Sequence, residues 1–302
     1  MAGTENYNPQ KKSELAFGIS CHLGEGPVWD ERNKRILWVD IIKGEIHWFF
    51  PDTGEHNYSE TGQLTGAIAL TDKGDILAAL QTGFVRVNLN DGSLQNISDP
   101  ESNLPDNRFN DGKCDPAGRF WAGTVSMSGT EKAGSLYTLE HDLSISTKVK
   151  NVTVSNGMAW SPDGATFYFI DTPTKQVVAY DYDNSNGSIT NKRIVVQIPL
   201  EEGYPDGMAI DTEGMLWIAL WDGWKVGRWN PQNGELIESI TLPVSRPTSC
   251  VFGGDKLQDL YITSACYGLG ENDLSNQPLA GSLFVLKNSG YQGLPVNEFR
   301  SV

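Results

Sequence analysis

Apolar residues recur along the chain in short runs that are separated by clusters of Gly, Pro, Asn and Asp. The runs are rich in Trp, Tyr, Phe, Val and Ile, as in RILWVD from Arg35 and LWIAL from Leu216. Such runs between turn-forming clusters are typical of β-strands, and the 3.6-residue period of an amphipathic helix is hard to find. The pattern therefore predicts an all-β protein.

The strand pattern repeats in six segments. Each opens with a polar residue, usually followed by Gly, and continues with an alternating apolar run, an Asp/Gly-rich turn and a second strand centred on an apolar pair. The segments read EGPVWDERNKRILWVDI, TGAIALTDKGDILAAL, NDGKCDPAGRFWAGT, NGMAWSPDGATFYFIDT, DGMAIDTEGMLWIAL and SCVFGGDKLQDLYITS. Their intervals are 39, 44, 47, 49 and 44 residues, counted between Trp38, Leu77, Trp121, Tyr168, Trp217 and Tyr261.

This period is that of a propeller blade, because four antiparallel strands occupy roughly 40 to 50 residues. Six repeats predict a six-bladed β-propeller with four-stranded antiparallel blades around a central channel. The first run of each repeat is the innermost strand, and its alternation predicts a half-buried strand. We expect a flexible segment over 1–14 and a single propeller domain over 15–302. The run from Ala16 to Cys21 should pair with a strand at Ser282 to Leu286 and close the ring, so that no sheet edge stays bare.

The net charge limits the classes of binding partner, and the cysteine spacing predicts the state of the thiols. The net charge of −15 disfavours nucleic acid and anionic membranes, because no Lys/Arg run supplies a basic patch. Neutral small molecules or cations are the expected partners, and a monomer is compatible with the sequence. The four cysteines are far apart and predict free, mostly buried thiols. No apolar stretch has signal-peptide or membrane-spanning character, so we expect a cytoplasmic protein.

The residues that open the six repeats all carry a side-chain oxygen. Equivalent positions in a propeller are related by rotation about the channel, so these side chains should converge at one mouth. Buried carboxylates and carboxamides repel unless something compensates, and a divalent cation does so. Oxygen ligands suit Ca²⁺, Mg²⁺ or Mn²⁺, and a carboxylate also holds Zn²⁺. Asp, Asn and Thr before Gly are each also typical of a turn, whereas Glu25 is the most informative of the set because Glu is a poor turn residue. The six are Glu25, Thr65, Asn110, Asn156, Asp206 and Ser249.

The motifs GEGPVWD, NRFNDGKCDPAGRFWAGT, SNGMAWSPDG, YPDGMAIDTEGMLWIA and CVFGG occur in this order along the chain. In these motifs the sequence resembles the senescence marker protein/gluconolactonase family, which includes regucalcin and the bacterial sugar lactonases. The resemblance implies a six-bladed propeller with one divalent ion held by Glu25, Asn156 and Asp206. It also implies that Arg108 and Asn110 contact the sugar and that Asp206 is the general base.

Within the family, the ALWDGW segment is more similar to bacterial pentono- and hexonolactonases than to animal members. Animal members carry a glutamate after the AGT turn, where this chain has Met127 or a neighbouring serine. Substrate contacts at that position are therefore not carried over.

Together these observations predict a metal-dependent lactonase that hydrolyses an aldonolactone, such as glucono-, xylono- or arabinonolactone. Ca²⁺ is the first choice of cation, and Zn²⁺, Mg²⁺, Mn²⁺ and Fe²⁺ stay open. Asp206 either removes a proton from water or orients a hydroxide held by the cation. The polar residues Asp106, Asn107 and Arg108 favour a polyol substrate.

Two alternatives stay open. One is a broader metal-dependent esterase that acts on aryl esters or organophosphates, which apolar mouth loops would favour. The other is a non-catalytic propeller that binds calcium. Nucleophilic catalysis has no support, because the sequence contains neither a GxSxG motif nor histidines at paired-ligand spacing.

Overall fold

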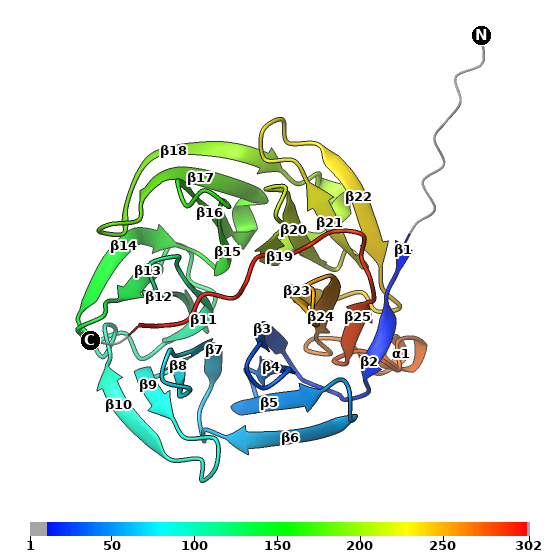
Figure 1. Cartoon of the computed structure of the whole chain (residues 1–302), viewed down its shortest axis with the longest axis horizontal. Helices are drawn as coiled ribbons and strands as arrows, with labels where there is room; N and C mark the ends of the chain where they lie inside the picture. The colour runs from blue at the N-terminus through cyan, green and yellow to red at the C-terminus, as the bar shows by residue number, and fades with distance from the viewer. Residues whose placement is uncertain (1–10, 301–302) are drawn as a thin grey trace.

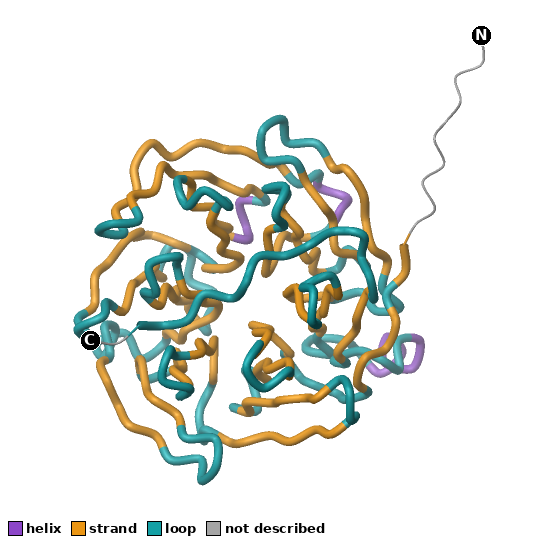
Figure 2. Tube along the Cα trace, viewed as in Figure 1, coloured by secondary structure: helices purple, strands orange, loops and turns teal. Residues whose placement is uncertain are grey.

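The computed structural model describes residues 11–300, in which six antiparallel β-sheets form a ring around a central channel (Figure 1). The six-bladed propeller predicted from the repeats is therefore confirmed. All six apolar pairs that define the repeat lie on the second strand of a blade, as predicted. Strands and turns make up nearly the whole described chain, and the few short helical segments lie in the connections (Figure 2).

The first three blades follow the chain order without interruption. Their strands are β3 (Gly24–Asp30), β4 (Arg35–Asp40), β5 (Glu45–Phe50) and β6 (Glu55–Glu60); β7 (Thr65–Leu70), β8 (Ile76–Leu80), β9 (Gly83–Val87) and β10 (Leu94–Ser98); and β11 (Asn107–Cys114), β12 (Phe120–Ser126), β13 (Gly134–Leu139) and β14 (Ile145–Val152).

The last three blades include two strands from the start of the chain. Their strands are β15 (Ser155–Trp160), β16 (Thr166–Asp171), β17 (Gln176–Asp183) and β18 (Ser188–Gln197); β19 (Tyr204–Ile210), β20 (Leu216–Trp221), β21 (Lys225–Trp229), β22 (Leu236–Thr241) and β1 (Lys11–Lys12); and β23 (Pro247–Gly253), β24 (Asp259–Ser264), β25 (Leu283–Leu286) and β2 (Glu14–Phe17). The connections contain η1 (Thr172–Thr174), η2 (Leu200–Glu202) and α1 (Glu271–Asn276).

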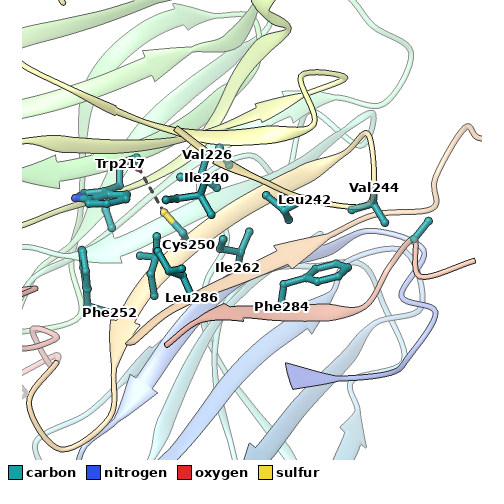
Figure 3. Close-up of a cluster of buried hydrophobic side chains, with 14 residues drawn as sticks. Trp217, Val226, Ile240, Leu242, Val244, Cys250, Phe252, Ile262, Phe284 and Leu286 are labelled. Atoms are coloured by element: carbon teal, nitrogen blue, oxygen red, sulfur yellow. Dashed lines mark hydrogen bonds between the residues drawn. The ribbon is translucent and has the colours of Figure 1, made fainter. Parts of the chain in front are cut away.

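The core consists of six hydrophobic clusters, one between each pair of neighbouring blades. Figure 3 shows the cluster between the fifth and sixth blades, where Trp217 packs edge-on against Phe252. The thiol of Cys250 lies in the same cluster and donates to the Trp217 carbonyl over 3.5 Å. Each sheet thus buries both of its faces against its neighbours.

Burial on both faces corrects the expectation of half-buried inner strands. Every residue of β7, β8 and β15 is buried, and only the outermost strands such as β6 and β18 are mostly exposed. The reason is that an inner strand lies between two other blades, so neither face meets solvent. This explains why the second strands read as nearly continuous apolar runs.

The ring closes between the start and the end of the described chain. β2 pairs antiparallel with β25, which confirms the predicted closing pair, although the strand runs over Glu14–Phe17 rather than from Ala16 to Cys21. β1 adds in parallel to β22 of the fifth blade, so the propeller begins before the predicted start at Leu15. Residues 1–10 of the predicted flexible segment lie outside the described residues.

The segment Leu294–Glu298, called the strap below, crosses one end of the channel (red in Figure 1). It is anchored at both ends, because Gly293 donates to the Leu257 carbonyl and Phe299 donates to the Leu70 carbonyl. Leu70 ends an innermost strand, so the strap covers the end of the channel at which those strands finish. The end at which they begin is not covered by the strap.

All four cysteines are free thiols, and three of them are buried, as the sequence predicts. Over residues 11–300, no helix combines the length and apolar character needed to span a membrane.

Candidate active site

Each innermost strand carries an irregularity in its pairing near its first residues. The shifts against the second strand fall between Glu25 and Val28, Thr65 and Ala67, Phe109 and Asp111, Asn156 and Met158, Pro205 and Met208, and Pro247 and Ser249. Extra residues of this kind bend a strand and redirect its side chains, and they are common beside functional sites. The irregularities therefore account for polar side chains that leave the apolar blade interfaces for the channel.

The glycines that follow the opening residues let neighbouring inner strands approach closely. A Cβ on Gly157 would lie 2.6 Å from the Asp206 carbonyl oxygen, and one on Gly66 would lie 2.4 Å from the Phe109 carbonyl oxygen. Both contacts are with backbone atoms, which can move away only at a cost in folding free energy. Glycine at this place thus brings the opening residues of successive blades together.

Two carboxyl groups meet at this mouth. Glu25 and Asp206 are 4% and 6% exposed. Burial raises the pKa of Glu25 well above its usual value, and the charges of Asp206 and Asp111 raise it further. Burial and the charge of Asp111 likewise raise the pKa of Asp206. The two groups therefore resist being ionised together unless positive charge lies beside them.

Asn156 contributes an acceptor without a protein partner. Its Nδ2 donates to Thr172 Oγ1 over 3.0 Å, and that hydroxyl donates to the Pro205 carbonyl over 2.8 Å, which fixes the amide plane. Its Oδ1 is buried and has no hydrogen-bond partner among the described residues. The Asn156 side chain is within hydrogen-bonding reach of Asp206. A buried acceptor is costly unless a hydrogen-bond donor or a cation binds it, and here it lies beside two carboxyl groups.

Arg108 and Asn110 lie at the same mouth. Arg108 Nη1 donates to Asn110 Oδ1 over 2.8 Å and to the Phe109 carbonyl over 2.9 Å. Asn110 Nδ2 in turn donates to the Ser155 carbonyl, which precedes Asn156. Burial lowers the pKa of Arg108 to about 10, and the charges of Glu25, Tyr267 and Asp206 raise it. The guanidinium thus faces the carboxyl groups and keeps donors free for a ligand.

One of the six opening residues does not join this group. The hydroxyl of Thr65 lies 2.7 Å from that of Thr61 and donates to the Gln63 carbonyl, so it serves the connection before β7. Ser249 lies beside the group, because a Cβ on Gly207, the residue after Asp206, would lie 2.1 Å from Ser249 Oγ. The expectation that all six oxygens converge is therefore wrong for Thr65, because its side chain follows local hydrogen bonds.

Asp111 and Lys113 are site residues that the motif NDGK did not reveal. They lie two apart on β11 and so share a face. Lys113 Nζ donates to the Met208 carbonyl over 2.7 Å, and its charge lowers the pKa of Asp111 against the larger upward effect of burial. Alternation from Arg108 would place both residues on the opposite face of β11, and it is the pairing irregularity between Phe109 and Asp111, visible only in the structure, that shifts the register by one residue.

A cavity of about 410 Å³ occupies the channel beyond these residues. Asp111 and Lys113 lie at its wall together with residues of all six innermost strands, and the strap residues Leu294 and Val296 cover it. The cavity lies toward the strap end of the channel, and the charge of Asp111 at its wall acts on the carboxyl groups of Glu25 and Asp206.

The donor set fits a hard divalent cation. Over residues 11–300 no three His, Cys, Asp or Glu side chains form a metal-binding group. The mouth instead combines two carboxyl groups with a carboxamide oxygen, which are oxygen ligands of the kind that Ca²⁺ accepts. The unpartnered Oδ1 of Asn156 and the raised pKa of both carboxyl groups fit a site that binds a cation.

The fold and the mouth together define a six-bladed propeller with a channel site of two carboxyl groups, two carboxamides and one guanidinium. A family model described as SMP-30/Gluconolactonase/LRE-like region matches residues 23–266, and the chain belongs to this family. The resemblance seen in the sequence motifs is confirmed.

Similar proteins cover nearly the whole chain. It is 42% identical over 276 residues to a Bacillus subtilis protein named "Putative sugar lactone lactonase YvrE", with 90% of this chain and 94% of that protein covered. It is 39% identical to regucalcin of Gallus gallus, with 95% and 98% covered. A solved structure of the calcium-binding protein regucalcin from Agrobacterium tumefaciens has a TM-score of 0.92 at 26% identity, with 96% and 98% covered.

Proposed function

We propose that this protein is a hydrolase that opens a sugar-acid lactone with the help of one divalent cation. The observation that carries the proposal is the convergence of Glu25, Asp206 and the unpartnered Oδ1 of Asn156 at the end of the channel that the strap does not cover. The name of the Bacillus subtilis relative supports a sugar lactone as substrate, and the regucalcin structure supports calcium as cation.

Glu25, Asn156 and Asp206 would hold the cation. A bound divalent cation polarises a carbonyl oxygen and offsets the negative charge that develops on it. Its positive charge also removes the repulsion between the two carboxyl groups, so both are ionised in the loaded site.

Asp206 is the proposed base. In its ionised form, its carboxylate takes a proton from water as the water oxygen attacks the carbonyl carbon. The acyl–oxygen bond of the ring then breaks, and the ring oxygen takes up a proton. The product is the open hydroxy acid, so one water is added and no other reactant is needed.

Arg108 and Asn110 would orient the substrate. Their mutual hydrogen bond leaves Nε and Nη2 of Arg108 and one N–H of Asn110 available, judged over the described residues. Directional hydrogen bonds from these groups to hydroxyls of the lactone would hold its carbonyl against the carboxyl groups.

The test uses purified protein treated with a chelator and assayed by acid release on glucono-, xylono- and arabinonolactone. Turnover should be absent after chelation and return with Ca²⁺, Mg²⁺, Mn²⁺, Zn²⁺ or Fe²⁺. Asp206→Asn should lower kcat by about 10²-fold or more, since general base catalysis contributes about 10²–10⁴. The matched control Asp142→Asn, in an exposed turn at the strap end, should leave kcat unchanged.

Metal affinity without turnover on any lactone would instead favour a calcium-binding propeller without catalysis. Near-normal turnover by Asp206→Asn would refute the assignment of the base while leaving lactone hydrolysis in place. Localisation in the cytoplasm remains a prediction from the sequence.

A further inference from the structure

Exposed apolar side chains gather at the carboxylate end of the propeller. Among the described residues, thirteen large hydrophobic side chains are exposed; five are on outer strands and only Leu143 is in a turn at the strap end. Large apolar clusters on a protein surface commonly mark binding sites. The other seven belong to connections or strand starts at the end of the propeller where the inner strands begin: Leu104, Met127, Leu200, Tyr204, Trp224, Tyr267 and Leu274.

Three aromatic residues of this group, called the aromatic rim below, are Tyr204, Trp224 and Tyr267, which are 44%, 45% and 50% exposed. Tyr204 begins β19, two residues before Asp206. Tyr267 packs edge-on against His22, three residues before Glu25, with ring centroids 6.3 Å apart. Trp224 lies in the turn between β20 and β21 at the same end. The aromatic rim therefore flanks the route to the carboxyl groups.

Trp224 adopts a conformation that costs energy. Its φ is +61°, in the left-handed region, at the turn residue directly before the third strand of its blade. The corresponding residues of the first and fourth blades are Gly44 and Lys175, with φ of +69° and +54°. A left-handed conformation costs a bulky residue about 1 kcal/mol or more. A strained, exposed indole at a position that suits glycine points to a function rather than to stability.

The aromatic rim is held in place before any ligand arrives. The backbone N–H of Trp224 donates to the Ser245 carbonyl, and the Trp224 carbonyl accepts from the backbone N–H of Leu242, so the turn that carries the indole is fixed. Arg246 bonds to Asp222 and to the Tyr267 carbonyl, which ties two connections of the mouth together. Such preorganisation lowers the entropy cost of binding.

Tyr204 is fixed by Lys175, whose ammonium lies 4.1 Å from the ring centroid and donates to the Leu200 carbonyl. Polar side chains that seemed available for a polyol are, by contrast, already bonded. Asp106 accepts from the hydroxyls of Ser126 and Ser128, both at 2.6 Å. Asn107 donates to Glu101 and to the Ala133 carbonyl, both at 3.0 Å. These hydrogen bonds of Asp106 use only its Oδ2 and those of Asn107 use only its Nδ2, so these two side chains offer a ligand fewer polar atoms than their residue types suggest.

We propose that, beyond sugar-acid lactones, this site accepts a lactone that carries an apolar alkyl substituent, which the aromatic rim binds. The inference rests on the proposed lactonase function and extends it to a second substrate class. Arg108 and Asn110 would hold the polar ring, while Tyr204, Trp224 and Tyr267 cover the substituent. Burial of a methylene favours binding by up to about fourfold.

The test compares γ-butyrolactone, γ-hexalactone and γ-decalactone with gluconolactone, using the calcium-loaded protein. The kcat/KM should rise along the alkyl series by about two- to fourfold for each methylene that the rim covers. Binding of the matching γ-alkyl lactams, which resist hydrolysis, is measured by calorimetry, and their affinity should rise in the same order. The lactams report on the rim even without turnover.

Trp224→Ser and Tyr267→Ser should flatten the chain-length dependence of both kcat/KM and lactam affinity. The matched control is Ile194→Ser, which removes an apolar side chain that is 58% exposed on β18 and distant from the mouth. It should retain the full chain-length dependence.

Hydrolysis of gluconolactone with no chain-length dependence in either series would overturn this inference and leave the proposed function intact. Lactam affinity that rises with chain length, without hydrolysis of any lactone, would support the aromatic rim as a binding surface and refute the lactonase. A chain-length dependence unchanged in both rim variants would also overturn the inference.

Discussion

At the scale of single residues, the site depends on two carboxyl groups that the fold removes from water. Burial is the main cause of the raised pKa of Glu25 and Asp206, and Asp111 adds negative charge to both. Sequence reasoning identified both residues: Glu25 because a glutamate before Gly-Pro has little reason to be a turn residue, and Asp206 from its place in the repeat and the family resemblance. It could not identify the contribution of Asp111, which requires the neighbouring blade.

The raised pKa of these carboxyl groups predicts how stability depends on pH. Unfolded, Glu25 and Asp206 ionise near their usual values of 4.5 and 3.8, whereas the cation-free folded protein keeps the protons to higher pH. Stability of the chelated protein should therefore be highest below about pH 4 as far as these groups are concerned, and fall as pH rises. Each unit of upward shift costs about 1.4 kcal/mol at high pH.

Thermal unfolding of chelated wild type and Glu25→Gln from about pH 4 to neutrality measures this effect. The variant should lose much of the pH dependence, and Ca²⁺ should raise the Tm of wild type most at neutral pH. Glu235→Gln, an exposed control at the strap end, should behave like wild type. Identical pH profiles for Glu25→Gln and wild type would contradict the assignment.

At the scale of elements, the turn before the third strand of each blade sets the shape of the mouth. Gly44 occupies it in the first blade, where a Cβ would lie 2.3 Å from the Gln63 carbonyl oxygen. The residue is left-handed, and its N–H donates to the Asp40 carbonyl. Glycine is needed here for two reasons, namely the backbone conformation and the close approach of the next connection.

Gly44→Ala should lower the free energy of unfolding by about 3 kcal/mol, since overpacking against backbone adds to the left-handed strain. Gly54→Ala is the matched control, because Gly54 is also left-handed, with φ +74°, but has no atom near its Cβ position. Gly54→Ala should lower the free energy of unfolding by about 1 kcal/mol. Urea denaturation of both variants measures the difference, and equal losses would show that the close contact is not a determinant.

At the scale of the whole molecule, stability depends on closing the ring between two distant parts of the chain. β2 covers the edge of β25, and Phe17 packs against Phe49 and stacks on His56 of the first blade. β1 adds only two residues and an ion pair between Lys11 and Glu238. β1 and β2 should therefore contribute unequally to the free energy of unfolding.

Removal of residues 1–13 should lower the free energy of unfolding by about 1 kcal/mol, because a partly exposed ion pair and a short edge pairing contribute little to stability. Removal of 1–17 also deletes β2, and it should cost about 3 kcal/mol or more and expose a sheet edge that promotes association. Denaturation midpoints and size-exclusion chromatography measure both effects. Equal midpoints for the two truncations would refute a special role of β2.

The sequence by itself determined the number of blades and the position of their second strands, because each repeat is a local pattern of apolar pairs and turns. It also identified the polar residues that open the inner strands. Glu25, Asn156 and Asp206 were named from the family resemblance, and their surroundings are consistent with that choice. These features can be predicted from the sequence because they depend only on nearby residues and their spacing.

Only the tertiary structure decided which opening residues meet. Thr65 bonds to its own connection, whereas Asp111 and Lys113 face the channel. Packing between blades also decided that the inner strands are buried on both faces, that the strap closes the far end, and that aromatic residues from separate connections share one mouth. Each of these depends on contacts between segments far apart in the chain, which a local pattern of residue types does not contain.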